Sequence, residues 1–205
     1  MSYDTDHVQN AGGTPERITG IHAFTDLVDN AALAGLYTTI RSKGTASGPE
    51  LVDGADVSKK TVYDYLRTLA SAGLITDIGE ENGATTYAAE DFELTLTVRD
   101  VTVSITPALV AVLSHREEHP VIDRVLEEHG LLTFALAHDL VMDHNEGNVT
   151  IRQIGDLTGL SSGMSYDLVD AIYTIRDFAE TASSPETFTP ANVDSDQHDV
   201  DVTEE

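Results

Sequence analysis

The sequence predicts a mainly helical α+β protein in which a small β-hairpin, or wing, accompanies several short helices. Three observations support this class. Apolar residues recur at the helical spacing i, i+3, i+4, i+7 in several segments. Threonines alternate with leucine and valine in residues 94–98 and 101–105, which is strand periodicity. Asn82 and Gly83 stand between two extended runs, and Asn-Gly in that position is a strong hairpin signal.

Composition narrows the class further. A chain of 205 residues suffices for one or two small domains. It contains no cysteine, which excludes disulfides and thiolate zinc sites. It has no apolar run of about 18 residues that could span a membrane, and its polar N-terminus lacks the pattern of a signal peptide. We therefore expect a cytoplasmic protein without a membrane partner.

The chain opens with an acidic segment, residues 1–20, that we expect to be disordered. Residues 21–28 suggest a helical piece that packs on the domain. Asp29 or Asn30 then opens a helix that ends before Gly44. Its apolar side has helical spacing and consists of Leu33, Leu36, Tyr37 and Ile40.

Residues 47–75 have the pattern of a short helix, a turn and a second helix. Ser47 and Glu50 have the spacing of a capping box. Ser58 is a suitable N-cap for the second helix, and Gly73 ends it. The apolar side of this helix comprises Val62, Tyr65, Leu66 and Leu69. This is the plan of a helix-turn-helix, in which the second helix offers side chains to a DNA groove.

A hairpin is expected next, with extended runs at residues 75–78 and 84–89 flanking a loop at residues 79–83. Three helices followed by a hairpin make a winged helix-turn-helix. The sequence resembles winged-helix transcriptional regulators of the ArsR and TrmB kind found in archaea. The resemblance lies in residues 57–63, in Leu66 and Leu69, and in residues 72–75. The resemblance covers residues 29–89, about a third of the chain, and implies a DNA-binding domain in a transcription regulator.

The remaining chain is predicted to continue with two strand segments and several helices. Residues 94–98 and 101–105 either form one long strand or turn at residues 99–100, and they could extend the sheet of the wing. Helices are expected to open at Pro107 and Pro120, with a break at Gly130 and a further helix at residues 131–144.

A second helix-turn-helix is predicted because the sequence from Thr150 onward is similar to the first one at an offset of 103 residues. Ser47 and Glu50 correspond to Thr150 and Gln153, which again have capping-box spacing. Further pairs match along the second helix: Ser58 with Ser161, Tyr63 with Tyr166, Leu66 with Val169 and Leu69 with Ile172. Its outward side carries serines and aspartates and no base before Arg176, so we interpret it as a helix-turn-helix in packing only. A chance resemblance and a second DNA contact are the alternatives.

The expected domains are therefore a winged helix-turn-helix at residues 21–105 and a helical dimerisation or regulatory region at residues 106–180. An acidic tail at residues 181–205 is expected to be disordered. Subunits are expected to pair, or a signal to be received, through apolar faces around Val110, Leu113, Val125 and Leu126.

The net charge is −25, from 36 acidic and 11 basic residues. Because DNA-binding proteins are usually basic, this balance taken alone argues against a nucleic-acid partner. Residues 41–70, however, hold five of the bases against four acids. Strong acidity with few lysines looks like a protein of a salt-accumulating haloarchaeon, where the Debye length falls to about 3 Å. A DNA-binding protein there depends on direct contacts, because counterion release contributes little affinity at molar salt.

The clustered bases suggest the candidate DNA contacts, although an ordinary solvated helix face is the alternative. We expect the lysines at the helix start to lie near phosphate and Arg67 to reach a base edge or the backbone. Asp64 accepts from a cytosine amine or pairs with Arg67. Glu80 and Glu81 would repel phosphate, so Thr85, Thr86 and Tyr87 are better candidates in the wing. Arg41 and Lys43, at the end of the first helix, fit the helix dipole as well as a phosphate. The chosen set is Ser58, Lys59, Lys60, Thr61, Tyr63, Asp64, Arg67, Lys43, Arg41 and Thr86.

The sequence gives only weak signals of metal binding or of catalysis. His115 and His119 are four residues apart, but no third metal ligand has diagnostic spacing. Residues 159–163 match the letters of a hydrolase nucleophile elbow, but a helix rather than a strand is expected before them. We therefore expect no catalytic residues, no metal and no cofactor.

Two functions follow from this sequence. The first is a sequence-specific winged-helix transcription regulator, active as a homodimer on double-stranded DNA, that reads DNA with residues 58–73 and the wing at residues 75–90. The second is a winged-helix adaptor that binds another protein and does not read DNA.

Overall fold

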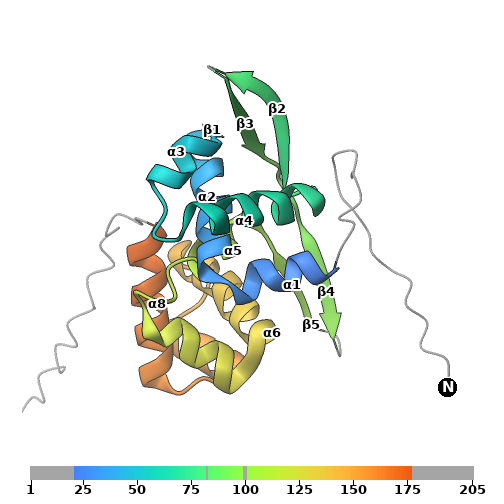
Figure 1. Ribbon diagram of the computed structural model, residues 1–205. Coiled ribbons are helices and arrows are strands. Elements are labelled where there is room, and N and C mark those ends of the chain that lie inside the picture. The colour runs from blue at the N-terminus through green and yellow to red at the C-terminus, as the bar shows by residue number, and fades with distance from the viewer. Residues whose placement is uncertain (1–20, 82, 99–100, 177–205) are drawn as a thin grey trace, which may run out of the picture.

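The computed structural model describes residues 21–81, 83–98 and 101–176 (Figure 1). The predicted disorder of residues 1–20 and 181–205 concerns segments outside these ranges. The elements in chain order are α1 (Ile21–Asp29), α2 (Ala31–Lys43), β1 (Thr45–Ser47), α3 (Gly48–Asp53), α4 (Lys59–Ser71), β2 (Ile75–Glu81), β3 (Ala84–Ala89), β4 (Leu94–Val98), β5 (Val101–Ile105), α5 (Pro107–Leu113), α6 (Pro120–Asn145), α7 (Ile151–Thr158) and α8 (Ser162–Arg176). The protein is a mixed α+β protein, as predicted.

The helices α2, α3 and α4 pack with a three-stranded antiparallel sheet of order β1-β3-β2. Their starts are capped as the sequence predicts. The Asn30 side chain accepts a hydrogen bond from the Leu33 N–H at 3.0 Å, and Ser47 and Glu50 form a complete capping box. Figure 1 shows the β2–β3 hairpin projecting at one end of the molecule beside α3, with α6 and α8 at the other end.

The hairpin differs from the predicted one in length. Strand β2 continues through residues 79–81, which were expected to form a loop, and Glu81 pairs with Ala84. A register shift between Asp77 and Gly79 makes this possible. Gly79 has a φ of 114°, which glycine adopts easily, and its N–H donates to Asp77 Oδ1 at 2.8 Å. The bulge leaves Ile78 between the two pairs, 52% exposed.

Two features of the strands were not predicted correctly. Strand β1 has only three residues and was missed, although it pairs with β3 along its whole length. Strands β4 and β5 form a hairpin of their own and do not extend the first sheet. The apolar residues of this hairpin, including Leu96, Val103 and Ile105, pack instead in the core around α6.

Helix α6 is interrupted at the predicted place. Gly130 has φ 82° and ψ 169°, which are not helical values, so the residues of α6 before and after Gly130 form two separate helical segments. The second segment packs against α7 and α8, with Phe134, Val141 and Ile172 fully buried. In the part of the chain that the structure describes, no helix is both long and apolar enough to cross a membrane.

Helix α5 lies between two hydrophobic cores. Val110 belongs to the core of α2 and α4, whereas Leu113 belongs to the core of α6 to α8. Val110, Leu113 and Val125 are 0% exposed, and Leu126 is half-buried against the second core. The expectation that these residues form a surface for a second subunit was therefore wrong. A helix that is apolar on all sides belongs in a protein interior.

Candidate nucleic-acid interface

Helix α4 begins at a side-chain cap. The Ser58 hydroxyl oxygen accepts a hydrogen bond from the Thr61 N–H at 3.2 Å, and the hydroxyls of these two residues are 2.7 Å apart. The first N–H groups of a helix have no partner within the helix and carry a partial positive charge. The start of α4 therefore favours an anion, and two lysines immediately follow the cap.

The outer side of α4 collects five of the predicted contacts. Because successive helical residues turn by about 100°, residues 59, 60, 63, 64 and 67 fall within an arc of about 140°. Val62, Leu66 and Leu69 lie on the opposite side and are at most 2% exposed. The buried side fixes the orientation of the helix, so its polar side faces outward.

Lys59 and Lys60 are exposed. Among the described residues, neither lysine has a carboxylate oxygen within 4.0 Å of its ammonium nitrogen. Lys59 Nζ lies 6.0 Å from the centre of the Tyr63 ring, at the outer limit of a cation–π contact. Both ammonium groups are free to bind an anion.

Tyr63 is half-buried and connects α4 to α3. A β-carbon placed on Gly48 would lie 3.0 Å from the Tyr63 hydroxyl, so this glycine lets the tyrosine approach the backbone of α3. Tyr63 therefore packs the helix pair together, and only part of its side chain is exposed.

Arg67 and Asp64 form an ion pair, which is one of the two arrangements considered from the sequence. Arg67 Nη1 lies 3.1 Å from Asp64 Oδ1, and the Arg67 side chain is 75% exposed. An exposed pair of this kind contributes about 0–1 kcal/mol, so a phosphate can compete for the guanidinium. Arg67 remains a candidate contact.

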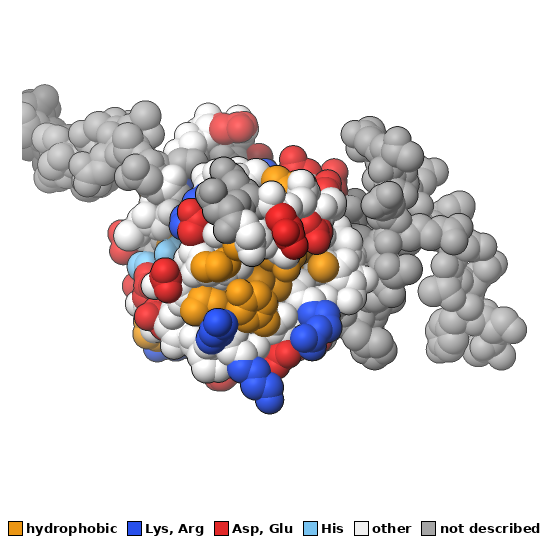
Figure 2. Space-filling model, turned by 45° about the horizontal axis from the view of Figure 1, so that its top comes forward, with side chains coloured by type: hydrophobic (Ala, Val, Ile, Leu, Met, Phe, Trp, Pro, Cys, Tyr) orange, Lys and Arg blue, Asp and Glu red, His pale blue; other side chains and the backbone are white. Residues whose placement is uncertain are grey.

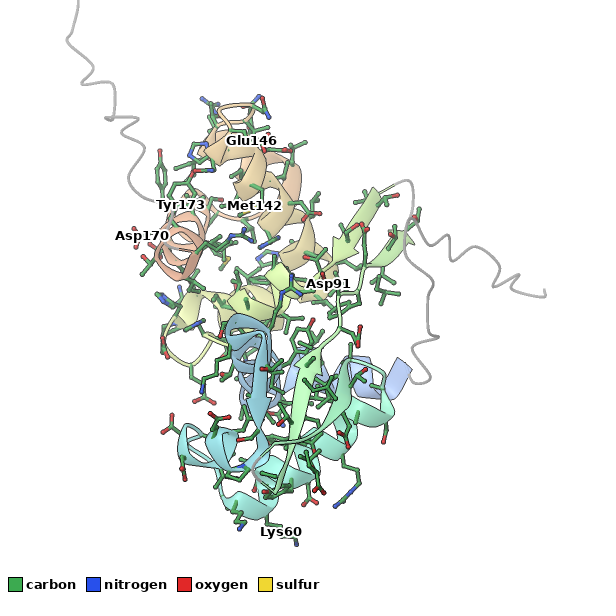
Figure 3. All side chains as sticks on the ribbon, turned by 90° about the horizontal axis from the view of Figure 1, so that it is seen from above. Lys60, Asp91, Met142, Glu146, Asp170 and Tyr173 are labelled. Atoms are coloured by element: carbon green, nitrogen blue, oxygen red, sulfur yellow. The ribbon has the colours of Figure 1, made fainter. Side chains whose placement is uncertain are left out.

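Of the two bases of helix α2, Arg41 does not join this surface. Arg41 pairs with Asp91 and hydrogen-bonds to it. Figure 3 shows Asp91 well away from Lys60, so Arg41 lies outside the outer face of α4. Lys43 is exposed, and its charge contributes to lowering the pKa of Glu50, whose main cause is hydrogen bonding from Ser47.

Thr86 is not a surface residue. It is 6% exposed, and its hydroxyl oxygen is buried with no hydrogen-bond partner among the described residues. The residue lies on the central strand β3, opposite Ser47 on one side and Gly79 on the other. The prediction that Thr86 contacts DNA was therefore wrong, whereas Thr85 and Tyr87 are half-buried.

The face that carries α3, α4 and the β2–β3 hairpin is polarised. Figure 2 shows an apolar area at its centre, with Lys and Arg side chains along its lower margin and Asp and Glu side chains above it. Exposed acids of the hairpin include Asp77 and Glu80. A polyanion would thus meet favourable charge at α4 and unfavourable charge at the hairpin.

The second helix pair repeats the construction without the bases. Thr150 and Gln153 form a complete capping box, as Ser47 and Glu50 do. Gly159 ends α7 with a φ of 76°, and Ser161 Oγ accepts from the Met164 N–H at the start of α8. Ser161, in the stretch with nucleophile-elbow letters, is therefore a helix cap.

The outward side of α8 carries exposed acids and lacks the lysines of α4. Asp167 and Asp170 are exposed, and Tyr166 is 60% exposed. Arg152 on α7 has a 90% exposed side chain, and its Nε lies 4.0 Å from Asp156. This surface is poorly suited to phosphate.

Ile78 is a surface residue that the sequence did not single out. It is exposed because the bulge removes it from the alternation of β2. The signal was the Asp-x-Gly sequence at residues 77–79, which is typical of a turn or bulge in an extended run.

In comparisons with known proteins, no protein-family model, no curated protein and no solved structure matches this chain. A function must therefore be inferred from the residues and their arrangement.

Proposed function

We propose that the protein is a winged helix-turn-helix transcription regulator that contacts double-stranded DNA with the outer face of α4. The observation that carries this proposal is that Lys59 and Lys60 are exposed at the capped start of an outward-facing helix and form no ion pair with any described residue. The pair stands out in a chain with a net charge of −25.

The order of elements supports the proposal. Helix α2, strand β1, helices α3 and α4, and the β2–β3 hairpin follow one another with β3 at the centre of the sheet. In helix-turn-helix proteins the second helix of the pair lies in the major groove, and its N-terminal residues contact the base edges. Here that helix is α4.

The proposed contacts divide by charge. Lys59 and Lys60 bind phosphates together with the N-terminal N–H groups of α4. Arg67 exchanges Asp64 for a phosphate or for a guanine edge. Because Glu80 and Asp77 repel the backbone, the hairpin lies against DNA less closely than α4 does.

The test uses the full-length protein and DNA that it selects from a random library in molar KCl. Lys60→Glu combined with Arg67→Glu should weaken binding about a hundredfold, taking ~1.4 kcal/mol for each reversed charge. The slope of log affinity against log salt should become shallower by about two per subunit.

A matched control carries the same change of charge elsewhere. Arg124→Glu with Arg152→Glu alters two exposed arginines on α6 and α7 and should leave binding within about twofold. Equal losses in the two double variants would show a nonspecific charge effect. Unchanged binding by the Lys60 and Arg67 variant would remove α4 from the interface.

Homodimerisation remains part of the proposal, since operators for such regulators are usually two-fold related. The pairing surface lies outside the buried residues first considered, Val110, Leu113 and Val125. Light scattering in molar KCl measures the subunit number directly.

The second candidate is a winged-helix adaptor that does not read DNA. It is favoured by the acids of the hairpin, Asp77 and Glu80, and by the ion pair that already engages Arg67. The adaptor predicts that no DNA sequence is enriched by selection in molar salt. Enrichment that the α4 variant abolishes contradicts it.

A further inference from the structure

A cavity of about 480 Å³ opens between the two halves of the structure. Its walls come from α2, from the turn between α3 and α4, from Tyr65 on α4, and from the connection between α5 and α6. This volume lies in the range of small-molecule sites, about 300–1,000 Å³. The cavity is separate from the outer face of α4.

The lining combines an apolar floor with polar groups. Leu36 and Leu51 are at most 6% exposed and supply the floor. Thr38 also lines the cavity, and its hydroxyl oxygen is buried with no hydrogen-bond partner among the described residues. The Tyr65 hydroxyl accepts from Asn30 Nδ2 at 2.9 Å, and its own O–H can donate to an occupant.

The charges of the lining have one sign. Asp56, Glu117 and Glu118 line the cavity, and the lining contains no lysine or arginine. His115 is its one base, and its Nδ1 lies 3.0 Å from Glu118 Oε2, which leaves Asp56 and Glu117 without a cation in the lining. The helix ends at Gly54 and Ser114 also reach the lining, and helix C-termini carry partial negative charge.

We infer that this cavity binds a small organic cation, an amine with an apolar body, and that the occupant bridges the turn before α4 to the α5–α6 connection. The apolar body rests on Leu36 and Leu51. The ammonium group lies among the carboxylates of Asp56 and Glu117.

The position of the cavity gives the occupant an influence on α4. Asp56 and Val57 are in the lining, and the next residue is Ser58, the N-cap of α4. An occupant that holds this turn against the α5–α6 connection fixes the start of α4 relative to the second core. This influence on DNA rests on the proposed function, whereas the binding of the cation does not.

The binding test compares three probes with one apolar body and different charges: cyclohexylmethylammonium, cyclohexylmethanol and cyclohexanecarboxylate. Each is titrated into the full-length protein without DNA, and binding is followed by amide chemical shifts in heteronuclear NMR. We expect the ammonium probe to bind at least tenfold more tightly than the other two and to shift the amides of Gly35, Gly54 and Ala55. Equal binding of the three probes, or shifts confined to other residues, would overturn the assignment.

Two variants complete the test. Asp56→Asn with Glu117→Gln should weaken binding of the ammonium probe about fivefold, because exposed charge pairs contribute modestly. Glu127→Gln with Glu128→Gln removes two exposed acids of α6 outside the lining and should change binding less than twofold. A loss of the same size in this control would show a general effect of net charge and refute the site.

The influence on α4 is measured separately with the selected DNA. A saturating concentration of the ammonium probe should change DNA affinity at least threefold, and this change should vanish in the Asp56 and Glu117 variant. Equal DNA affinity with and without the probe refutes the coupling. If no DNA is selected at all, the proposed function fails while the NMR result still decides whether the cavity binds the cation.

Discussion

Gly155 provides a sharp test of how the second helix pair is held together. A β-carbon at this position of α7 would lie 3.0 Å from Ser165 Oγ and 3.1 Å from the carbonyl oxygen of Leu160. Glycine to alanine within a helix normally stabilises by about 1 kcal/mol. Overpacking costs about 1–3 kcal/mol, and because the Leu160 oxygen belongs to the backbone and cannot swing away, we take the upper part of this range, about 2–3 kcal/mol.

We therefore expect Gly155→Ala to destabilise the protein by about 1–2 kcal/mol, which lowers Tm by about 3–6 °C for a chain of this size. Gly163→Ala is the matched control, because a β-carbon there meets no atom within 4 Å. It should raise Tm by about 2–4 °C through helix propensity, which is about 1 kcal/mol. Both are measured by circular dichroism melting in the same KCl concentration. A Gly155→Ala protein as stable as wild type would refute the close packing of α7 on α8.

Three further substitutions test single contacts. Hydrogen bonds from the Ser47 N–H and hydroxyl hold the pKa of Glu50 below the ordinary value of a glutamate. The ionised cap therefore stabilises the fold above that ordinary value, and the effect is lost as the pH falls through the folded-state pKa. Glu50→Gln should keep the cap and reduce acid sensitivity in urea unfolding between about pH 3 and pH 6; an unchanged pH profile contradicts this. The buried Tyr37 hydroxyl, whose pKa burial raises to about 12, donates a hydrogen bond to the Glu90 carbonyl oxygen at 2.7 Å. Tyr37→Phe removes this donor and should lower the free energy of unfolding in urea by about 1–2 kcal/mol. Thr86→Val removes a buried unpartnered hydroxyl and should stabilise by about 1 kcal/mol with DNA affinity unchanged, whereas lost DNA binding would return Thr86 to the interface.

The features that local sequence predicts well are those that depend on neighbours in the chain. The capping boxes at Ser47 and Thr150 involve residues three apart, and both are present in the structure. The break at Gly130 follows from the backbone freedom of one residue. Such signals need no knowledge of tertiary packing.

The features that sequence missed depend on distant partners. Strand β1 has too few residues to show a periodicity and exists through its pairing with β3, some forty residues away. Thr86 is covered because β3 is the central strand, and no local pattern states which strand of a small sheet is central. Arg41 meets Asp91 only after folding.

The burial of helix α5 could have been predicted from its sequence. All seven of its residues, Pro107–Leu113, are apolar, and a helix without a polar side is buried on all sides. A face intended for a second subunit would show apolar residues on one side only. The same reasoning makes the polar outer side of α4 an exposed surface.

The most direct test of the proposed DNA contact uses the absence of cysteine from this chain. An iron chelate attached to a single new cysteine cleaves DNA that lies close to it. Ala70→Cys places the chelate on the exposed outer side of α4, and Asp170→Cys places it on the exposed side of α8. We predict localised cleavage of the selected DNA from position 70 and only background cleavage from position 170. Background cleavage from position 70, or equal cleavage from both positions, would contradict DNA recognition by α4.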